Sequence, residues 1–513
     1  MAPRNGARAV WAVLLLCRAH AGSHTHEEHI ERGGLRLRGA SANSADVEET
    51  PHAFSNETVG SGSGCIAEWQ TCSVDDDNAI SCCDGLTCVV KSDYYAQCKS
   101  SGPSPVNNPT HRPSPMPYPA PTKVPSPSPT KAPTKGGSTP SPTPKSGPTP
   151  SPGYACGNPL TGKDSEVATW YATWAAKYIV NLGSGKCVQR IGQGNDCVSE
   201  GTGYGMLMAA WMDDQTNFDG LWAFAQEHFD SNGLMNWQIS SGNQVVGSGS
   251  ASDGDIDMAL GLVKAAEVWG GSYLADATTL INNIMAHEID SSTHTVLPGD
   301  SWDVSSPPYN PSYFAPGHFR IFEEVTGDSL WADAITQGYS LNSDCANYNS
   351  GTGLVPDWSE SLTSCNPGSN WVSWTLANGA DYYYDAVRTP WRLAIDYVWS
   401  CESKAKSAVK NMATFFADQG PSAMGQGFTI SGSSLGYSTS TCFVGTASTA
   451  IVASPLSSSS TRSDWWDYLE GMDQENSYFC DTLQMIMYIF DSGNFEMPSV
   501  STARAMANNA PVA

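Results

Sequence analysis

Apolar residues recur at helical spacing through most of the chain beyond residue 153. In these stretches apolar side chains return every three or four positions, which is the pattern of a helix with one face to bury. The stretches are residues 166–182, 205–213, 256–269, 273–288, 403–417, 463–471 and 481–491. Loops rich in Gly, Ser, Asn and Pro separate them, and β-runs do not alternate with the helices as a parallel α/β fold requires. The pattern predicts a mainly α fold for one large domain, residues 154–513.

The start of the chain has the pattern of a secretory signal. Two arginines within the first eight residues precede the apolar run 9–17, and an Ala-His-Ala cleavage site follows at residues 19–21. The apolar run is too short for a membrane anchor, and no later stretch is apolar enough to span a bilayer. We therefore expect residues 1–21 to be a signal peptide and the protein to be secreted, extracellular or in a cell wall.

Two further stretches are polar and irregular. Residues 22–64 include a glycosylation sequon at Asn56 and are expected to hold little fixed structure. Residues 99–153 contain eighteen of the chain's 33 prolines, mixed with Ser, Thr and Lys. This composition predicts an extended, O-glycosylated linker.

Residues 65–98 are too few to form an adequate core, so disulfides are expected to staple them into a small β-rich knot. Six cysteines allow fifteen pairings, among which the sequence does not choose; they are Cys65, Cys72, Cys82, Cys83, Cys88 and Cys98. Trp69, Tyr94 and Tyr95 can stack on sugar rings, and Gln97 can hydrogen-bond to them. The run CCDGLTCVVKSDYYAQC resembles the C-terminal half of a fungal-type (family 1) cellulose-binding module. The resemblance implies cellulose binding; a knottin-like domain of another role is the alternative.

Composition and charge exclude several function classes. Without Cys17, which belongs to the signal, fourteen cysteines remain, an even number that favours disulfides in an oxidising compartment. No C-x-x-C pair argues for a zinc site. The net charge of −25 argues against nucleic acid or an anionic membrane as a partner and suits a neutral substrate.

Three aspartates crowd the start of the helix predicted at residues 256–269. Ser252 or Asp253 can cap this helix, and acids in its first turn suit the positive end of its dipole. An EF-hand calcium loop is excluded, because neither its glycine nor its glutamate position is matched. For Asp255 and Asp257 we favour structural capping, but three acids exceed what capping needs.

Two other segments carry acids in a pattern that suits chemistry. In SEGTGYGMLMAAW, Glu200 precedes a turn into a helix, and glycines there would let a substrate approach the backbone: Gly201, Gly203 and Gly205. A helix N-terminus lowers the pKa of an acid, whereas a proton donor needs a raised pKa, so burial or a nearby anionic Asp253 would have to reverse the effect. In YYYDAVRTPWR, Asp385 and Arg388 are three residues apart and share a face of a helical turn. The guanidinium would keep Asp385 ionised, as a general base requires, although a surface ion pair is the alternative from spacing alone.

These three acidic segments resemble the motifs of glycoside hydrolase family 8, and the similarity extends from about Glu166 to Phe495. The resemblance implies an (α/α)6 barrel with an open cleft that hydrolyses glycosidic bonds with inversion and needs no metal or cofactor. It implies that Glu200 is the general acid and that Asp385 is the general base, as in the cellulase-like branch. Asp253 would hold the sugar at the point of cleavage, and Asp396 is the reserve candidate for the base.

Aromatic side chains are expected to line the cleft as sugar platforms, together with Arg388 as a substrate-binding residue. The candidates are Trp237, Trp302, Tyr313, Tyr384 and Tyr478. Trp302 and Tyr313 are preferred because they adjoin Pro- and Gly-rich loops, although any one Trp could equally be a core residue. Among the eight cysteines of this domain, Cys187–Cys197 and Cys345–Cys365 are plausible local disulfides.

The sequence therefore predicts a secreted, monomeric, modular endo-β-1,4-glucanase whose partner is a polysaccharide, cellulose or a related β-glucan. An endo-β-1,4-xylanase on the same scaffold is the alternative among enzymes. A non-catalytic protein that binds cell-wall polysaccharide is the alternative outside them. Glu200, Asp253 and Asp385 together disfavour the second alternative, because binding alone needs the aromatic residues and no acid–base pair.

Overall fold

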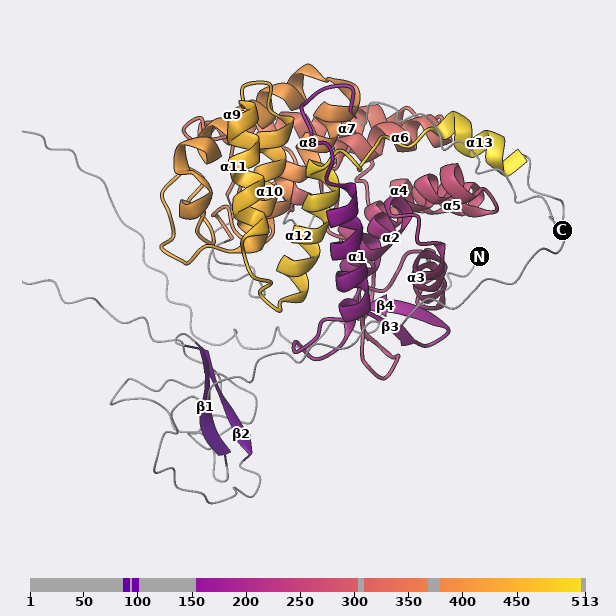
Figure 1. Cartoon of the computed structure of the whole chain (residues 1–513). Coiled ribbons are helices and arrows are strands. Elements are labelled where there is room, and N and C mark those ends of the chain that lie inside the picture. Colours follow the sequence, from indigo (N-terminus) through magenta and orange to yellow (C-terminus); the bar gives the residue numbers. More distant parts are fainter. Residues whose placement is uncertain (1–85, 93–94, 101–153, 303–308, 368–378, 509–513) are drawn as a thin grey trace, which may run out of the picture. The chain divides into compact units, whose positions relative to one another are not determined.

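The computed structural model describes residues 86–92, 95–100, 154–302, 309–367 and 379–508 (Figure 1). By internal contacts the chain divides into two compact units, Met1–Ser138 and Thr139–Ala513. In the part of the chain that is described, no helix is both long and apolar enough to cross a membrane.

In the first unit, strands β1 (Leu86–Ser92) and β2 (Tyr95–Ser100) form an antiparallel hairpin. Cys88 on β1 pairs in register with Cys98 on β2, and Tyr95 and Gln97 lie on β2. The predicted signal, the polar segment and most of the cysteine-rich module and linker lie outside the described residues, as do Trp69 and Tyr94.

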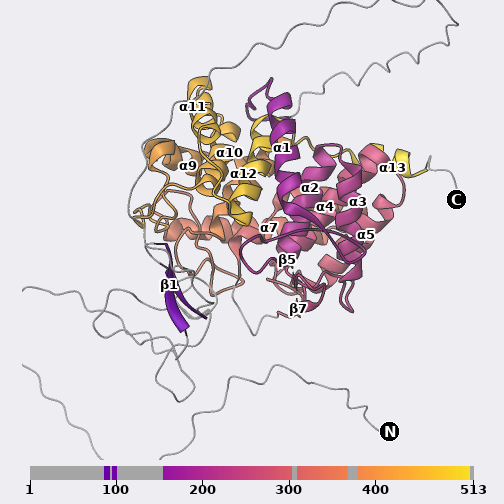
Figure 2. The ribbon, with the colours of Figure 1, turned by 60° about the horizontal axis from the view of Figure 1, so that its bottom comes forward.

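The helices of the second unit form two concentric rings (Figures 1 and 2). The inner helices each pack against the next, and the last returns to the first: α2 (Ser199–Trp211), α4 (Ser252–Trp269), α6 (Pro316–Thr326), α8 (Thr389–Ser400), α10 (Thr441–Ala453) and α12 (Tyr478–Asp491). The outer helices pack on the inner ones, mainly on α12, α2, α4, α6, α8 and α10 in that order: α1 (Asp164–Tyr178), α3 (Gln215–Glu227), α5 (Tyr273–His287), α7 (Leu330–Asp344), α9 (Ser403–Gln419) and α11 (Ser459–Glu470). Helix α9 also packs on α10, and α5 also packs on α6. Helix α13 (Val500–Asn508) packs on α4 and α5. The predicted mainly α domain is confirmed.

Short strands and 3-10 turns connect the rings. The strands form two small antiparallel sheets: β3 (Ile179–Leu182) with β4 (Gly185–Val188), and β5 (Cys197–Val198) with β6 (Gln238–Ile239) and β7 (Val245–Gly247). The 3-10 turns are η1 (Pro311–Tyr313), η2 (Cys345–Asn347), η3 (Ala386–Arg388) and η4 (Pro421–Ala423). The predicted helix 166–182 is wrong at its end, because the last four residues form β3, where β-branched Ile179 and Val180 suit an extended backbone.

Two of the helices that the pattern missed are buried on almost all sides. Every residue of α10 is buried, and so is every residue of α8 except Ser400. A helix surrounded by protein needs no polar face and therefore shows no apolar–polar period. Neither helix was predicted, and α3, α6, α7 and α13 were also missed. By contrast, the amphipathic α9, predicted at residues 403–417, buries one face only.

The predicted capping of α4 is wrong. Ala251 is its N-cap residue, and no side chain caps it. Ser252 Oγ instead donates to the carbonyl of Leu297 at 2.6 Å, and Asp255 accepts the backbone N–H of Met235 at 3.1 Å. Asp257 pairs with Arg392 on α8. Asp255 and Asp257 therefore make tertiary contacts, and such contacts cannot be predicted from the spacing of residues along one helix.

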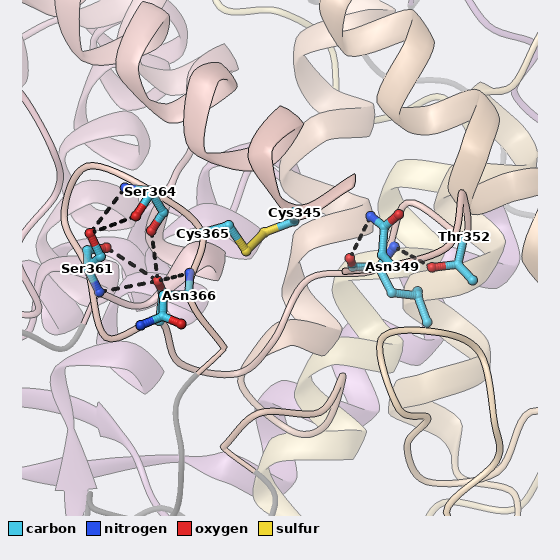
Figure 3. The surroundings of a disulfide bond; sticks show 9 residues. Cys345, Asn349, Thr352, Ser361, Ser364, Cys365 and Asn366 are labelled. Carbon is cyan, nitrogen blue, oxygen red and sulfur yellow. Dashed lines mark hydrogen bonds between the residues drawn. A yellow bond between two sulfur atoms is a disulfide. The ribbon is translucent and has the colours of Figure 1, made fainter. Parts of the chain in front are cut away.

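Four disulfides brace the second unit within the described residues. The predicted pairs Cys187–Cys197 and Cys345–Cys365 are confirmed. The other two join distant segments: Cys156–Cys401 and Cys442–Cys480. Figure 3 shows the Cys345–Cys365 bond, which closes residues 346–364 into a loop at the end of α7.

Helices α2 and α4 lie side by side because glycines face each other between them (Figures 1 and 2). A Cβ on Gly203 would lie 2.7 Å from the carbonyl oxygen of Gly254, and a Cβ on Gly254 would lie 2.6 Å from the carbonyl carbon of Ser199. A Cβ on Gly201 would meet the Tyr478 hydroxyl at 2.8 Å. The expected turn before the helix is wrong, since α2 already begins at Ser199. The glycines lie inside the helix and admit protein neighbours.

We expect Gly254→Ala to destabilise the domain by about 1–3 kcal/mol, because the added methyl group meets backbone that has little freedom to move. Thermal unfolding should show a lower Tm than the wild type. Gly242→Ala is the matched control, since its Cβ would meet only the Ser240 hydroxyl, at 3.8 Å. Equal Tm values for the two variants would contradict the close approach of α2 and α4.

Candidate active site

Three of the predicted acids meet at one guanidinium. Arg388 ends η3, and its side chain is 2% exposed. Its Nη1 donates to Glu200 Oε2 and to Asp253 Oδ2, each at 2.7 Å, and its Nη2 donates to Asp385 Oδ1 at 2.7 Å. Helices α2 and α4 and the turn η3 thus converge on one charge. The structure brings together the four residues that the sequence placed in three separate segments.

Both carboxyl oxygens of Glu200 are hydrogen-bonded. It lies in the first turn of α2, where its Oε1 accepts the Tyr478 hydroxyl at 2.9 Å. Burial raises the pKa of Glu200 to about 7, against the opposing charge of Arg388, and the negative charge of Asp253 raises it further. Burial therefore outweighs the lowering effect of the helix N-terminus, as the sequence analysis required. Below neutral pH most molecules carry the proton that a general acid needs.

Asp385 is the most exposed of the three acids. Its side chain is 31% exposed, compared with 4% for that of Asp253. Its Oδ1 also accepts Asn310 Nδ2 at 3.1 Å, and its Oδ2 accepts Trp358 Nε1 at 3.0 Å. Donors thus fix both oxygens of a carboxylate that solvent can reach, an arrangement suited to holding a water molecule.

Asp253 lies deeper, at the start of α4. Its Oδ1 accepts the backbone N–H of Gly254 at 2.9 Å, while its Oδ2 faces Arg388. Burial raises the pKa of Asp253, and the charge of Arg388 opposes that rise. Asp253 is therefore the most buried of the three acids, and both of its oxygens are hydrogen-bonded.

Two of the predicted aromatic residues border the three acids. The ring of Tyr313 lies 5.2 Å from Arg388 Cζ. Burial raises the pKa of Tyr313, and the negative charges of Asp253 and Asp385 raise it further. Tyr478 is buried and bonds to Glu200 as described.

The other predicted aromatic residues have different surroundings. Trp237 is 40% exposed, its ring covers Gly247, and its carbonyl accepts the N–H of Ser199, next to Glu200. Tyr384 is half-buried and donates to Gln426 at 3.0 Å. Trp302 packs against a small apolar cluster, which favours a structural role there.

The reserve base, Asp396, lies in a different ion-pair group. It is fully buried on α8, where it accepts Arg320 Nε at 2.6 Å and the Tyr339 hydroxyl at 2.5 Å. Nothing in these contacts joins it to Arg388 or Glu200. The structure thus separates Asp396 from the acids and leaves Asp385 among them.

Sequence reasoning missed three residues that contact the acids or Arg388. Asn310 and Trp358 both donate to Asp385, and the Ser312 hydroxyl accepts Arg388 Nε at 3.1 Å. Asn310 lies in the segment NPSYFAPGHF that was examined only for its tyrosine. Trp358 lies in an irregular loop with no periodic signal, so only the tertiary structure identifies it.

Comparisons with known proteins agree with this geometry. Residues 154–493 match the family described as "Glycosyl hydrolases family 8". Endoglucanase A of Acetivibrio thermocellus is 36% identical over 339 residues, which cover 63% of this chain and 68% of that protein. Endoglucanase C of Ruminiclostridium cellulolyticum is 35% identical over 340 residues, which cover 64% of this chain and 71% of that protein.

Solved structures show the same fold. The apo β-1,3-1,4-glucanase from Paenibacillus sp. X4 aligns with a TM-score of 0.61 at 29% identity, over 66% of this chain and 96% of that one. Rex8A from Paenibacillus barcinonensis, complexed with xylose, aligns with a TM-score of 0.57 at 18% identity, over 66% of this chain and 98% of that one. The second likeness concerns the fold alone.

We expect Tyr478→Phe to raise the pKa of Glu200 above about 7, because the hydroxyl bond that the variant loses lowers it. The pKa can be read from a pH titration of glutamate side-chain carboxyls by 13C NMR, with Glu200→Gln assigning the signal. Tyr348→Phe is the control, since Tyr348 is 48% exposed and lies in the loop after α7, in a different segment from the three acids. An unchanged or lower pKa in Tyr478→Phe would contradict the assigned bond.

Proposed function

The chain belongs to glycosyl hydrolase family 8, and we propose that it is an endo-β-1,4-glucanase that hydrolyses internal bonds of cellulose or a related β-glucan with inversion. The observation that carries the proposal is the meeting of Glu200, whose pKa is raised to about 7, and a solvent-accessible Asp385 on one buried guanidinium. We identify the two rings of helices with an (α/α)6 barrel.

The proposed reaction uses Glu200 as the acid and Asp385 as the base. Glu200 donates its proton to the leaving oxygen, and Asp385 takes a proton from the water that attacks the anomeric carbon from the opposite face. Two 2.7 Å bonds to different nitrogens of Arg388 keep the bonded oxygens of Glu200 and Asp385 within about 8 Å of each other. This upper limit overlaps the lower part of the range of about 6.5–9.5 Å that inverting hydrolases use to accommodate a water.

The remaining residues would bind and orient the sugar. Asp253 is proposed to hold the sugar at the point of cleavage, and Arg388 to fix all three acids relative to one another. Trp237 and Tyr313 are the aromatic residues proposed for stacking, since Trp237 is 40% exposed and the ring of Tyr313 lies 5.2 Å from Arg388 Cζ. Tyr384 is a more distant platform.

Xylan is the second candidate substrate. Rex8A, a reducing-end xylose-releasing exo-oligoxylanase, is also similar in sequence, but at 25% identity over 44% of this chain. The relatives at 35–36% identity over a larger share of the chain are all endoglucanases. A glucan is therefore the first choice.

Hydrolysis of cello-oligosaccharides by the full chain should release the α-anomer first, as followed by proton NMR. Glu200→Gln and Asp385→Asn should each lower kcat about 10²- to 10⁴-fold, because each removes one partner in proton transfer. Glu166→Gln, on the outer helix α1, is the control and should keep full activity. An initial β-anomer would contradict inversion, and cleavage of xylan alone would favour the second substrate.

The N-terminal features fit a secreted modular enzyme. We propose that residues 65–98 bind cellulose through Trp69, Tyr94, Tyr95 and Gln97 and that residues 99–153 tether them to the catalytic domain. A signal peptide and glycosylation belong to the same proposal, as does a monomeric state.

Sedimentation with microcrystalline cellulose tests the binding module. The full chain should co-sediment, and Trp69→Ala should remain largely in the supernatant, because stacking on sugar rings is lost. Hydrolysis of soluble oligosaccharides by Trp69→Ala should equal that of the wild type. Equal co-sedimentation of both proteins would refute the role of Trp69.

A further inference from the structure

A buried aspartate that no motif singles out lies beneath the turn that carries Asp385. Asp357 is 5% exposed. Its Oδ1 accepts the backbone N–H of Tyr383 at 2.8 Å and that of Ala386 at 2.7 Å. These two donors lie on either side of Asp385 in the chain. One oxygen thus closes the short turn from which Asp385 projects.

Asp357 and the next residue, Trp358, make further hydrogen bonds to the segment around Asp385. The backbone N–H of Asp357 donates to the carbonyl of Asp381 at 2.7 Å, and that of Trp358 donates to the carbonyl of Gly379 at 2.9 Å. The Trp358 indole then reaches Asp385 Oδ2 at 3.0 Å. Asp357 therefore fixes the backbone and Trp358 fixes the carboxylate.

The loop that carries the dipeptide is itself anchored. The disulfide Cys345–Cys365 closes it, and inside it Asn349 Nδ2 donates to the carbonyl of Leu354 at 3.1 Å (Figure 3). Ser359 exchanges two backbone hydrogen bonds with Tyr309, each at 2.8 Å. Tyr309 precedes Asn310, which donates to Asp385 as Trp358 does. Asn310 and Trp358 thus belong to segments joined directly to each other.

We propose that Asp357 is a positioning residue for the general base: its Oδ1 holds the 383–386 turn so that Asp385 faces the attacking water. The proposal rests on the proposed function of Asp385 and adds a residue that does not touch the substrate. The acceptor oxygen, not the charge of Asp357, does the positioning. Burial raises the pKa of Asp357 well above its usual range, and the nearby charge of Asp385 raises it further, so a neutral acceptor suits the site.

Two substitutions separate the oxygen from the charge. Asp357→Asn keeps an acceptor in the position of Oδ1, so its kcat should stay within about threefold of the wild type. Asp357→Ala removes the acceptor, and kcat should fall about 10²-fold with KM little changed, since a misplacement of roughly 1 Å can cost that much. Activity is measured on soluble β-glucan with the full chain. Circular dichroism and Tm report whether each variant is folded.

Azide rescue distinguishes a positioning role from a purely structural one, because azide should restore turnover only where the general base is what has been lost. Azide attacks the anomeric carbon itself as the glycosidic C–O bond breaks, while Glu200 protonates the leaving oxygen, so no general base is needed. It should raise the turnover of both Asp357→Ala and Asp385→Ala and yield a glycosyl azide. It should leave Glu200→Gln unrescued.

Asp290→Ala is the matched control. Asp290 Oδ1 also accepts two backbone N–H groups, from Ser292 at 3.1 Å and Thr293 at 2.7 Å, but in a turn that makes no contact with the acids. Its kcat should match that of the wild type.

Three results would overturn the proposal: full kcat in Asp357→Ala, a kcat in Asp357→Asn as low as in Asp357→Ala, or no rescue by azide where Asp385→Ala is rescued. If Asp357→Ala does not fold, the kcat of Asp357→Asn still decides, since a loss near 10²-fold would refute the role of the oxygen. Failure of the wild type to cleave β-glucan would instead refute the proposed function.

Discussion

The buried guanidinium of Arg388 is the interaction on which the site depends. Bringing ions out of water costs several kcal/mol per ion, and good geometry must offset that cost. Here both Nη atoms bind carboxylates at 2.7 Å, and Nε reaches the Ser312 hydroxyl at 3.1 Å. Without Arg388, three carboxylates would face one another with no cation between them. The bonds from Arg388 thus offset the repulsion between the carboxylates of α2, α4 and the 383–386 turn, and the same bonds hold these acids in place.

The ion pair between Asp257 and Arg392 lies one helical turn further along than the pair between Asp253 and Arg388 and has the same arrangement. Asp257 follows Asp253 by four residues, and Arg392 follows Arg388 by four, so both pairs join the same two segments. His318 lies 3.0 Å from Asp257, and burial lowers the pKa of this histidine, so that it stays neutral. Two guanidinium charges therefore face four carboxyl groups, Glu200 and Asp385 included. The charges balance more closely when Glu200 holds its proton, which agrees with its raised pKa.

Local sequence rules failed where neighbours from distant parts of the chain decided the outcome. The acids of α4 had the pattern of helix capping, yet Asp255 and Asp257 bind Met235 and Arg392. The glycines of α2 suggested a turn, yet Gly203 lies inside the helix and makes room for α4. In both cases the residue type indicated a special role, but the partner that explains the role lies on another segment of the chain.

The sequence by itself determined the mainly α class and four of the outer helices, α1, α5, α9 and α11, because a helix with one buried face has a visible period. It also determined the candidates Glu200, Asp253 and Asp385, since each stands in a distinctive segment. Only the tertiary structure decided that Arg388 joins all three and that Asp396 belongs elsewhere. It alone revealed Asp357 and Trp358, because hydrogen bonds from an irregular loop follow no sequence period. It also decided the pKa of Glu200, because the groups that bury this residue and the charges near it come from other segments of the chain.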